Sequence, residues 1–169
     1  PLLKRGDQSE KPVGYIDTYK DQIILVSGNG FYILSIDKKS LKEENFNYRE
    51  IKHNLTEVMS GYRNFIPSKF GIKDVTIIDN FIYVSYTKEL KPDCYNLSIL
   101  KSRIGLGELN FEELSIENNQ KCIYDYQRFN PHAGGGRIIE LENNKIGLSY
   151  GSFSFFENIL EKNNYWGKN

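Results

Sequence analysis

The apolar positions along the chain follow a repeated plan of two short strands joined by a polar turn. Three segments show this plan, at residues 15–27, 72–86 and 136–151. In each segment, β-branched and aromatic residues flank a turn that contains Asp or Asn, residue types that tolerate the positive φ of a tight hairpin. The pattern therefore predicts three β-hairpins.

Further apolar runs follow the first two hairpins and predict additional strands. Residues 30–36 close the first unit, and residues 96–101 close the second. The hairpin turns recur at a period of roughly 60 residues, which is longer than the period of simple propeller repeats. Three to four strands per unit is the content of a propeller blade, which packs on its neighbours because one small sheet cannot bury its own faces.

We therefore expect an all-β chain that forms an incomplete β-propeller of about three blades of antiparallel hairpins. The blade units of this single partial domain are placed at about 13–50, 66–115 and 131–169. Closed propellers have about four to eight blades, so the remaining blades or a partner chain would complete the ring. A two-sheet β-sandwich is the alternative fold, since hairpins alone do not distinguish the two. Little helix is expected beyond a turn or two at 156–162.

Composition limits the classes of partner. Of the 169 residues, 39% are hydrophobic, including 12 Tyr and 10 Phe, which is enough for one globular core. The 22 basic residues balance the 22 acidic ones, so no net field draws the chain toward nucleic acid or an anionic membrane surface. No stretch reaches the roughly 18 consecutive apolar residues that a membrane span requires. We expect neither a nucleic-acid partner nor a membrane span.

The two cysteines carry the only indication of location. Cys94 and Cys122 have neither the CxxC spacing nor the paired histidines of a zinc site. They form either a disulfide, which would suit a secreted or periplasmic protein, or two buried thiols. Two short motifs, Asn-Leu-Thr at 54–56 and Asn-Leu-Ser at 96–98, match the glycosylation sequon.

The loop before the third hairpin carries the strongest candidate for chemistry. Its sequence at 130–137 is Asn-Pro-His-Ala-Gly-Gly-Gly-Arg. Pro131 and the three glycines predict a turn that would hold the imidazole of His132 at the entrance of a strand. A neutral imidazole there could act as a general base, since its unperturbed pKa is about 6.5. The alternative is that His132 is an ordinary polar loop residue.

Several other residues have either a structural or a ligand-binding interpretation. The Gly-Asn-Gly stretch at 28–30 is interpreted as a hairpin or bulge, because it lacks the spacing of a dinucleotide-binding loop. His53 is expected to be a solvated loop residue. Trp166 with Tyr165 is either a packing anchor or a platform for a sugar ring. Arg137, at the start of a strand, could orient a backbone carbonyl or a ligand.

Three stretches together resemble a known family. They are Phe-Gly-Ile-Lys-Asp at 70–74 with Asn-Phe-Ile-Tyr-Val-Ser-Tyr-Thr at 80–87, then residues 132–149, then Tyr-Trp-Gly-Lys at 165–168. In order and spacing they resemble the soluble glucose and sorbosone dehydrogenases, which are six-bladed propellers that oxidise aldose sugars with pyrroloquinoline quinone (PQQ). The resemblance covers about the last hundred residues.

The resemblance implies a site and its cofactors. His132 matches the family's general base, which removes the proton of the anomeric hydroxyl of the bound sugar while hydride passes to the quinone. PQQ and calcium are the implied cofactors, and Lys69 and Arg137 are candidates to bind the quinone. No metal ligand is expected in this chain, because the family's calcium ligands lie mainly in later blades. The 169 residues alone are therefore expected to be inactive.

The alternative function is a non-catalytic propeller that acts as a binding or assembly module. The family's third hairpin usually ends in Gly-Asp, whereas this chain has Gly151 followed by Ser152. The family can carry an Asp before its catalytic His, whereas this chain has Pro131. Both departures remove a carboxylate from the position where a sugar would bind.

Overall fold

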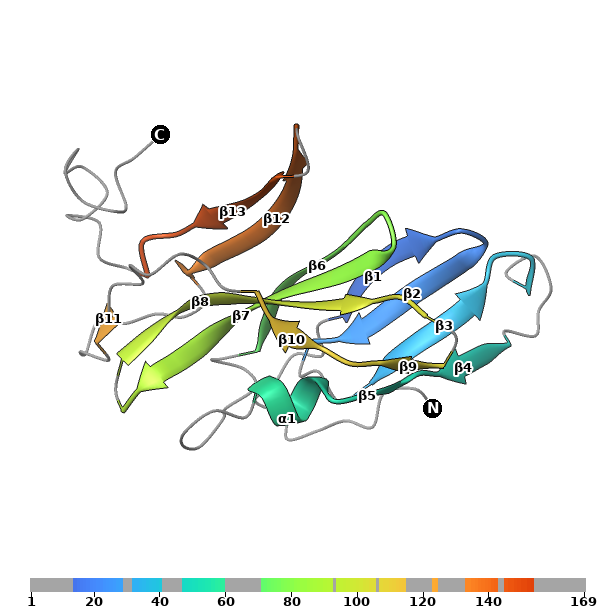
Figure 1. Cartoon of the computed structure of the whole chain (residues 1–169), viewed down its shortest axis with the longest axis horizontal. Helices are drawn as coiled ribbons and strands as arrows, with labels where there is room; N and C mark the ends of the chain where they lie inside the picture. The colour runs from blue at the N-terminus through green and yellow to red at the C-terminus, as the bar shows by residue number, and fades with distance from the viewer. Residues whose placement is uncertain are drawn as a thin grey trace.

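The computed structural model describes residues 14–28, 32–40, 47–59, 71–92, 94–105, 107–114, 123–124, 133–142 and 145–153. Within these residues the chain is almost wholly β-strand, with one short helix, α1 (Leu55–Met59) (Figure 1). The strands form antiparallel sheets, apart from one short parallel pair. The prediction of an all-β chain is confirmed. The helical turn expected at 156–162 lies outside the described residues.

The first sheet is an antiparallel meander of four strands in chain order. It contains β1 (Gly14–Tyr19), β2 (Gln22–Ser27), β3 (Ile33–Asp37) and β4 (Tyr48–Glu50). The predicted hairpin at 15–27 and the strand that follows it are both confirmed. In the turn between β1 and β2, Lys20 has a positive φ of +53°. This two-residue turn requires a positive φ at its first position, whichever residue occupies that position.

The second sheet repeats the meander. It contains β6 (Ile72–Ile78), β7 (Phe81–Lys91), β8 (Cys94–Arg103) and β10 (Glu112–Glu113), and β11 (Ile123–Tyr124) also pairs with β8. The predicted hairpin and the strand at 96–101 are confirmed. Here the turn places its positive φ, again +53°, on Asp79, in agreement with the Asp and Asn pattern.

Two smaller pairs complete the described structure. β12 (Gly135–Leu141) and β13 (Lys145–Tyr150) form the third predicted hairpin, which is confirmed. β5 (Lys52–His53) pairs in parallel with β9 (Glu108–Leu109). The interpretation of His53 as a solvated loop residue is therefore wrong. His53 is half-buried in β5, and its Nδ1 accepts a hydrogen bond from the backbone N–H of Leu55 at 3.3 Å.

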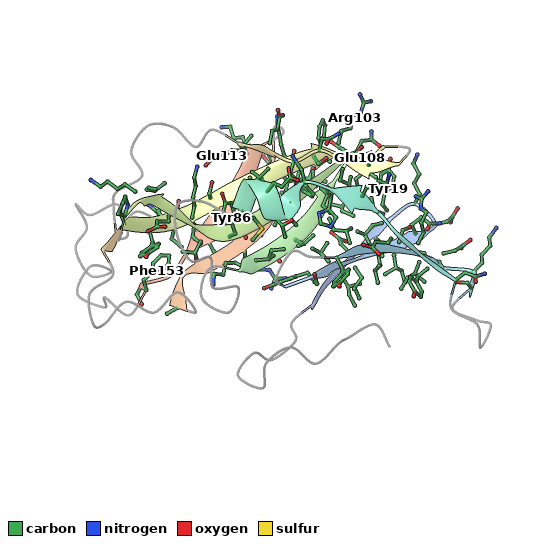
Figure 2. All side chains as sticks on the ribbon, turned by 90° about the horizontal axis from the view of Figure 1, so that it is seen from below. Tyr19, Tyr86, Arg103, Glu108, Glu113 and Phe153 are labelled. Carbon is green, nitrogen blue, oxygen red and sulfur yellow. The ribbon has the colours of Figure 1, made fainter. Side chains whose placement is uncertain are left out.

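The second sheet is covered on both faces. Its first face packs against the first sheet and α1 in the main core, which includes Val26, Leu55, Val84 and Tyr86. Its second face packs against the β12–β13 hairpin through a smaller cluster around Phe153. Tyr86 and Phe153 mark the two faces (Figure 2). Seven consecutive residues of β8, Cys94 to Leu100, are buried, because neighbouring residues of a strand point to opposite faces.

The first strands of the successive units lie beside one another. Three hydrogen bonds join β1 to the β6 segment, and residue numbers rise together on both sides: Tyr15 Oη to Ile72 O (2.6 Å), Ile77 N to Asp17 Oδ2 (2.6 Å) and Tyr19 Oη to Asn80 Oδ1 (2.8 Å). β1 and β6 therefore run in the same direction. On its other side β6 contacts β12, so it lies between the other two first strands (Figure 1).

Candidate functional site at the start of the third hairpin

The start of β12 lies against the beginning of β6 and the middle of β7. Gly136, with φ +105°, makes the closest approach. A Cβ atom on Gly136 would lie 2.5 Å from Lys73 Cβ and 3.3 Å from Ser85 Oγ, so no other residue fits without displacing its neighbours. The hydroxyl of Ser85 donates a hydrogen bond to the carbonyl oxygen of Gly136. We call Lys73, Asp74, Ser85 and Gly136 the seam cluster.

The residues before Gly136 are fixed from the opposite side by the end of β13. The N–H of Gly151 donates to the carbonyl of Gly134 at 2.8 Å, and the N–H of Phe153 donates to the carbonyl of Ala133 at 3.0 Å. A Cβ on Gly151 would lie 2.0 Å from the carbonyl oxygen of Ala133. The chain that follows His132 is therefore held between β13 and the second sheet.

Lys73 brings a cation to this seam. The pairing of β6 with β7 shifts register between Ile72 and Asp74, which places Lys73 at an irregularity of the strand. Burial lowers the pKa of the Lys73 amine to about 8, because an ammonium group loses solvation when it is removed from water. At neutral pH the amine is mostly protonated, so it can bind a carboxylate, and it gives up its proton more readily than an ordinary lysine.

Asp74 connects the seam to both neighbouring strands. Its Oδ2 accepts a hydrogen bond from the backbone N–H of Ile138 at 2.7 Å. Burial raises the pKa of the Tyr15 hydroxyl, and the charge of Asp74 raises it further. Tyr15 therefore stays protonated at neutral pH and donates to the carbonyl of Ile72. This end of β1 and β6, together with Ser85 of β7, therefore combines one cation, one carboxylate and two hydroxyl groups.

Buried hydroxyl groups continue along the face of β7 that points toward the hairpin. Ser85 and Thr87 are both buried there. Among the described residues, Thr87 Oγ1 is a buried oxygen without a hydrogen-bond partner. A strand position that packs against another sheet is normally apolar, so these hydroxyls make the contact between β7 and the hairpin unusually polar.

The structure tests few of the residues that the sequence singled out. His132 and Lys69 lie outside the described residues, as do Trp166 and Tyr165. Arg137 is exposed at the start of β12, where its backbone N–H donates to Ser149 Oγ at 2.9 Å.

Sequence reasoning did not select Lys73, Asp74 or Ser85. The charged pair Lys73-Asp74 inside an otherwise apolar strand was a signal that could have pointed to a site. The sequence marks Ser85 only as a member of the stretch at 80–87, because Ser is common in strands and its partner Gly136 lies 51 positions away.

Cys94 is buried and disulfide-bonded. The chain contains one other cysteine, Cys122, which lies outside the described residues. Cys122 directly precedes β11, whose Ile123 lies opposite Tyr95 of β8. The pairing of Cys94 with Cys122 stays a prediction.

Neither sequon is available for glycosylation in the folded chain. The amide of Asn54 makes two hydrogen bonds with the backbone of Phe111: its Nδ2 donates to the carbonyl at 3.2 Å, and its Oδ1 accepts from the N–H at 2.7 Å. Asn96 is fully buried in β8. A glycan on either amide nitrogen would displace this packing.

The described part of the chain contains no group of three or more His, Cys, Asp or Glu side chains that could hold a metal ion. Within the same residues, no helix is long and apolar enough to cross a membrane. Comparison with known proteins adds no relative: no protein-family model matches the chain, and neither the curated proteins nor the solved structures contain a significant match.

Proposed function

We propose that this chain is part of a sugar dehydrogenase-like β-propeller that oxidises an aldose with PQQ, with His132 as the general base. The observation that carries the proposal is the fixed backbone after His132. Residues 133–136 are bound to β13 on one side and to the seam cluster on the other. A general base must be held within hydrogen-bonding reach of the proton it removes, and a loop anchored on both sides satisfies this need.

The propeller part of the proposal is supported by how the sheets repeat. Each of the two larger sheets contains an antiparallel meander, and the first strand of each meander lies beside the first strand of the next unit. The β1 and β6 strands run in the same direction, and the second sheet is covered on both faces. In a two-sheet sandwich each sheet has one solvated face, whereas an internal propeller blade has none.

The residues at the seam fit a cofactor that carries carboxylates. Lys73 provides a partly buried cation at the seam, and Lys69 provides a second on the basis of the family resemblance. Arg137 is exposed between the buried Gly136 and Ile138, so it would reach the cofactor only from the solvent side. Lys73 and Lys69 would hold the carboxylates of PQQ, and the quinone would supply the acceptor for hydride. The described residues contain no group of three or more His, Cys, Asp or Glu side chains that could hold a metal ion, so no step is assigned to calcium.

The chain's own contribution to the reaction is proton removal and positioning. A neutral His132 would take the proton of the anomeric hydroxyl as the C–H hydride leaves, which avoids a positively charged oxocarbenium ion. Lys73 would orient the anionic cofactor beside this base. We also propose that the protein is secreted or periplasmic, since the disulfide bond at Cys94 suits an oxidising compartment.

Two measurements test the proposal. The chain is mixed with PQQ and calcium, and binding is followed through the absorbance of the quinone. Reduction of an artificial acceptor is then followed with a panel of aldoses, alone and with any C-terminal continuation of the chain. We expect quinone binding by the chain itself, and turnover only with the remaining blades present, which His132→Ala removes while binding is retained. Absence of quinone binding, or turnover unchanged in His132→Ala, would refute the proposal.

A non-catalytic binding or assembly module is the second candidate. The observation that favours it is Ser152, which directly follows Gly151 at the end of the third hairpin, where the resemblance would place a carboxylate. This candidate predicts sugar binding on a glycan array that survives His132→Ala. Tight quinone binding would count against it.

A further inference from the structure

The first sheet has an apolar face that points away from the core. Its strand register forms two rows across the sheet on this face, Ile16–Leu25–Leu34 and Ile23–Ile36–Tyr48. Leu34 is buried, whereas the other five are exposed or half-buried, and none of the six belongs to the main core cluster, which takes the alternate positions such as Ile24, Val26 and Ile33. We call this surface, together with Tyr32 beside β3, the first-sheet outer face.

The β12–β13 hairpin has a second face of the same kind. Ile138 is buried toward the second sheet, so its neighbours Ile139 and Leu141 point the other way. Both lie against Gly147, which has no side chain to cover them. We call Ile139, Leu141 and Gly147 the hairpin outer face.

All the exposed large hydrophobic residues in the described part of the chain lie on these two faces. They are Ile16 (65% exposed), Tyr48 (54%), Tyr32 (50%), Ile139 (50%) and Leu141 (45%). Isolated apolar residues on a surface need no explanation, but grouped ones mark sites where another molecule binds. Because the second sheet lies between the first sheet and the hairpin, the two faces are at opposite ends of the stack (Figure 1).

The charges beside the two faces are opposite. On the first-sheet outer face, the row that contains Leu34 ends at Glu50 of β4. On the hairpin outer face, Leu141 lies opposite Lys145 of β13. Both charged residues are exposed, so an ion pair can form at the rim when the faces meet.

We propose that these two faces bind each other between copies of the chain, so that the hairpin outer face of one copy docks on the first-sheet outer face of the next. The chain already packs one sheet face on another twice, at the two faces of the second sheet, and this contact would add a third of the same kind. Such a head-to-tail contact joins two different surfaces, so it forms a ring or an open chain of copies. The proposal goes beyond the proposed function and does not rest on it.

The test uses two variants, each of which carries a substitution that prevents docking through one of the two outer faces. Ile16→Lys disables the first-sheet outer face, and Ile139→Lys disables the hairpin outer face. Molar mass is measured by light scattering on a size-exclusion column over a series of concentrations. We expect the wild type to associate as concentration rises, and each variant alone to remain a 19.6 kDa monomer. An equimolar mixture of the two variants should form a dimer, because each supplies the face that the other lacks.

Glu108→Lys adds the same side chain outside both faces and should associate like the wild type. Circular dichroism checks that each variant is folded; if Ile16→Lys is not, Tyr48→Lys tests the same face. A wild type that stays monomeric at every concentration overturns the proposal. Association of Ile139→Lys alone also overturns it, since that requires two first sheets to meet, and so does a mixture that stays monomeric.

Discussion

The carboxylate of Asp74 in β6 accepts a hydrogen bond from the backbone N–H of Ile138 in β12, at 2.7 Å. The same arrangement occurs one unit earlier, where Asp17 of β1 accepts from the N–H of Ile77 in β6 at 2.6 Å. In the described residues no backbone ladder joins these first strands. A carboxylate from one strand therefore satisfies a backbone donor that would otherwise be buried without a partner.

Asp74→Ala should destabilise the protein by about 1–3 kcal/mol, because it leaves the N–H of Ile138 without an acceptor. Asp74→Asn keeps an acceptor oxygen and should lose less. Urea unfolding measures both variants, with Glu142→Ala at the exposed hairpin turn as the control. In Asp74→Ala, hydrogen exchange should increase relative to the wild type more in β12 and β13 than in the first sheet. An equal increase in both regions would mean that Asp74 does not hold the hairpin.

Gly136→Ala should lower the free energy of unfolding by about 1–3 kcal/mol, since it adds a Cβ at a strained φ of +105° against Lys73. Gly105→Ala is the matched control, because a Cβ at Gly105 meets no atom within 4 Å. Thermal unfolding of the two variants gives the comparison. If both changes had the same effect, the close approach of β12 to β6 would not be needed for stability.

Glu113 makes stability depend on pH at the edge of the second sheet (Figure 2). Burial alone would raise its pKa, but hydrogen bonds from Lys88 and Ser98 and the charge of Lys88 lower it below the ordinary value. The Lys88 Nζ to Glu113 Oε2 distance is 2.5 Å. Because the pKa is lower in the folded state, the stabilisation is complete above the ordinary carboxylate pKa and is lost as pH falls through the lowered one.

The measurement for Glu113 compares wild type with Glu113→Gln in urea at a series of pH values. The wild type should be more stable at neutral pH, and the difference should shrink below pH of about 4.3, the ordinary carboxylate value. Glu112→Gln is the control, since its contact with Lys101 is longer, at 3.4 Å, and more exposed. A difference that stays constant from neutral to acid pH would contradict the prediction.

The three hairpins were predictable because their signals are local. Apolar alternation and an Asp or Asn turn lie within a dozen or so neighbouring residues, as at Asp79, and short-range preferences decide the result. The seam was not predictable in the same way, since Asp74 and Ile138 are 64 positions apart and no local rule pairs them. The error at His53 has a similar cause: β5 has only two residues and forms by pairing with the distant β9.

Because Cys94 is disulfide-bonded, we predict that its bond to Cys122 closes a covalent loop. A peptide map without reductant should show Cys94 joined to Cys122, and reduction should lower the free energy of unfolding by roughly 3–4 kcal/mol for a loop of this length. Intact mass after alkylation counts the free thiols before and after reduction. Two alkylated thiols without reduction would contradict the prediction, and a disulfide-linked dimer would show that Cys94 pairs between chains.

Lys73 gives the most direct chemical test of the seam. Its pKa of about 8 in the folded protein compares with about 10.4 for an ordinary lysine. Between these values the unfolded chain binds more protons, so the stability of the wild type should rise with pH relative to Lys73→Met. Lys52→Met, at an exposed position of β5, is the matched control for removal of a lysine charge.

Acylation of the amine measures the same property without unfolding. The labelling rate of Lys73, followed by mass spectrometry of its peptide, should reach half of its maximum near pH 8. If Lys73 titrated instead near the ordinary lysine value of about 10.4, it would be a solvated surface cation, and the proposal that it orients a cofactor beside His132 would lose its structural support.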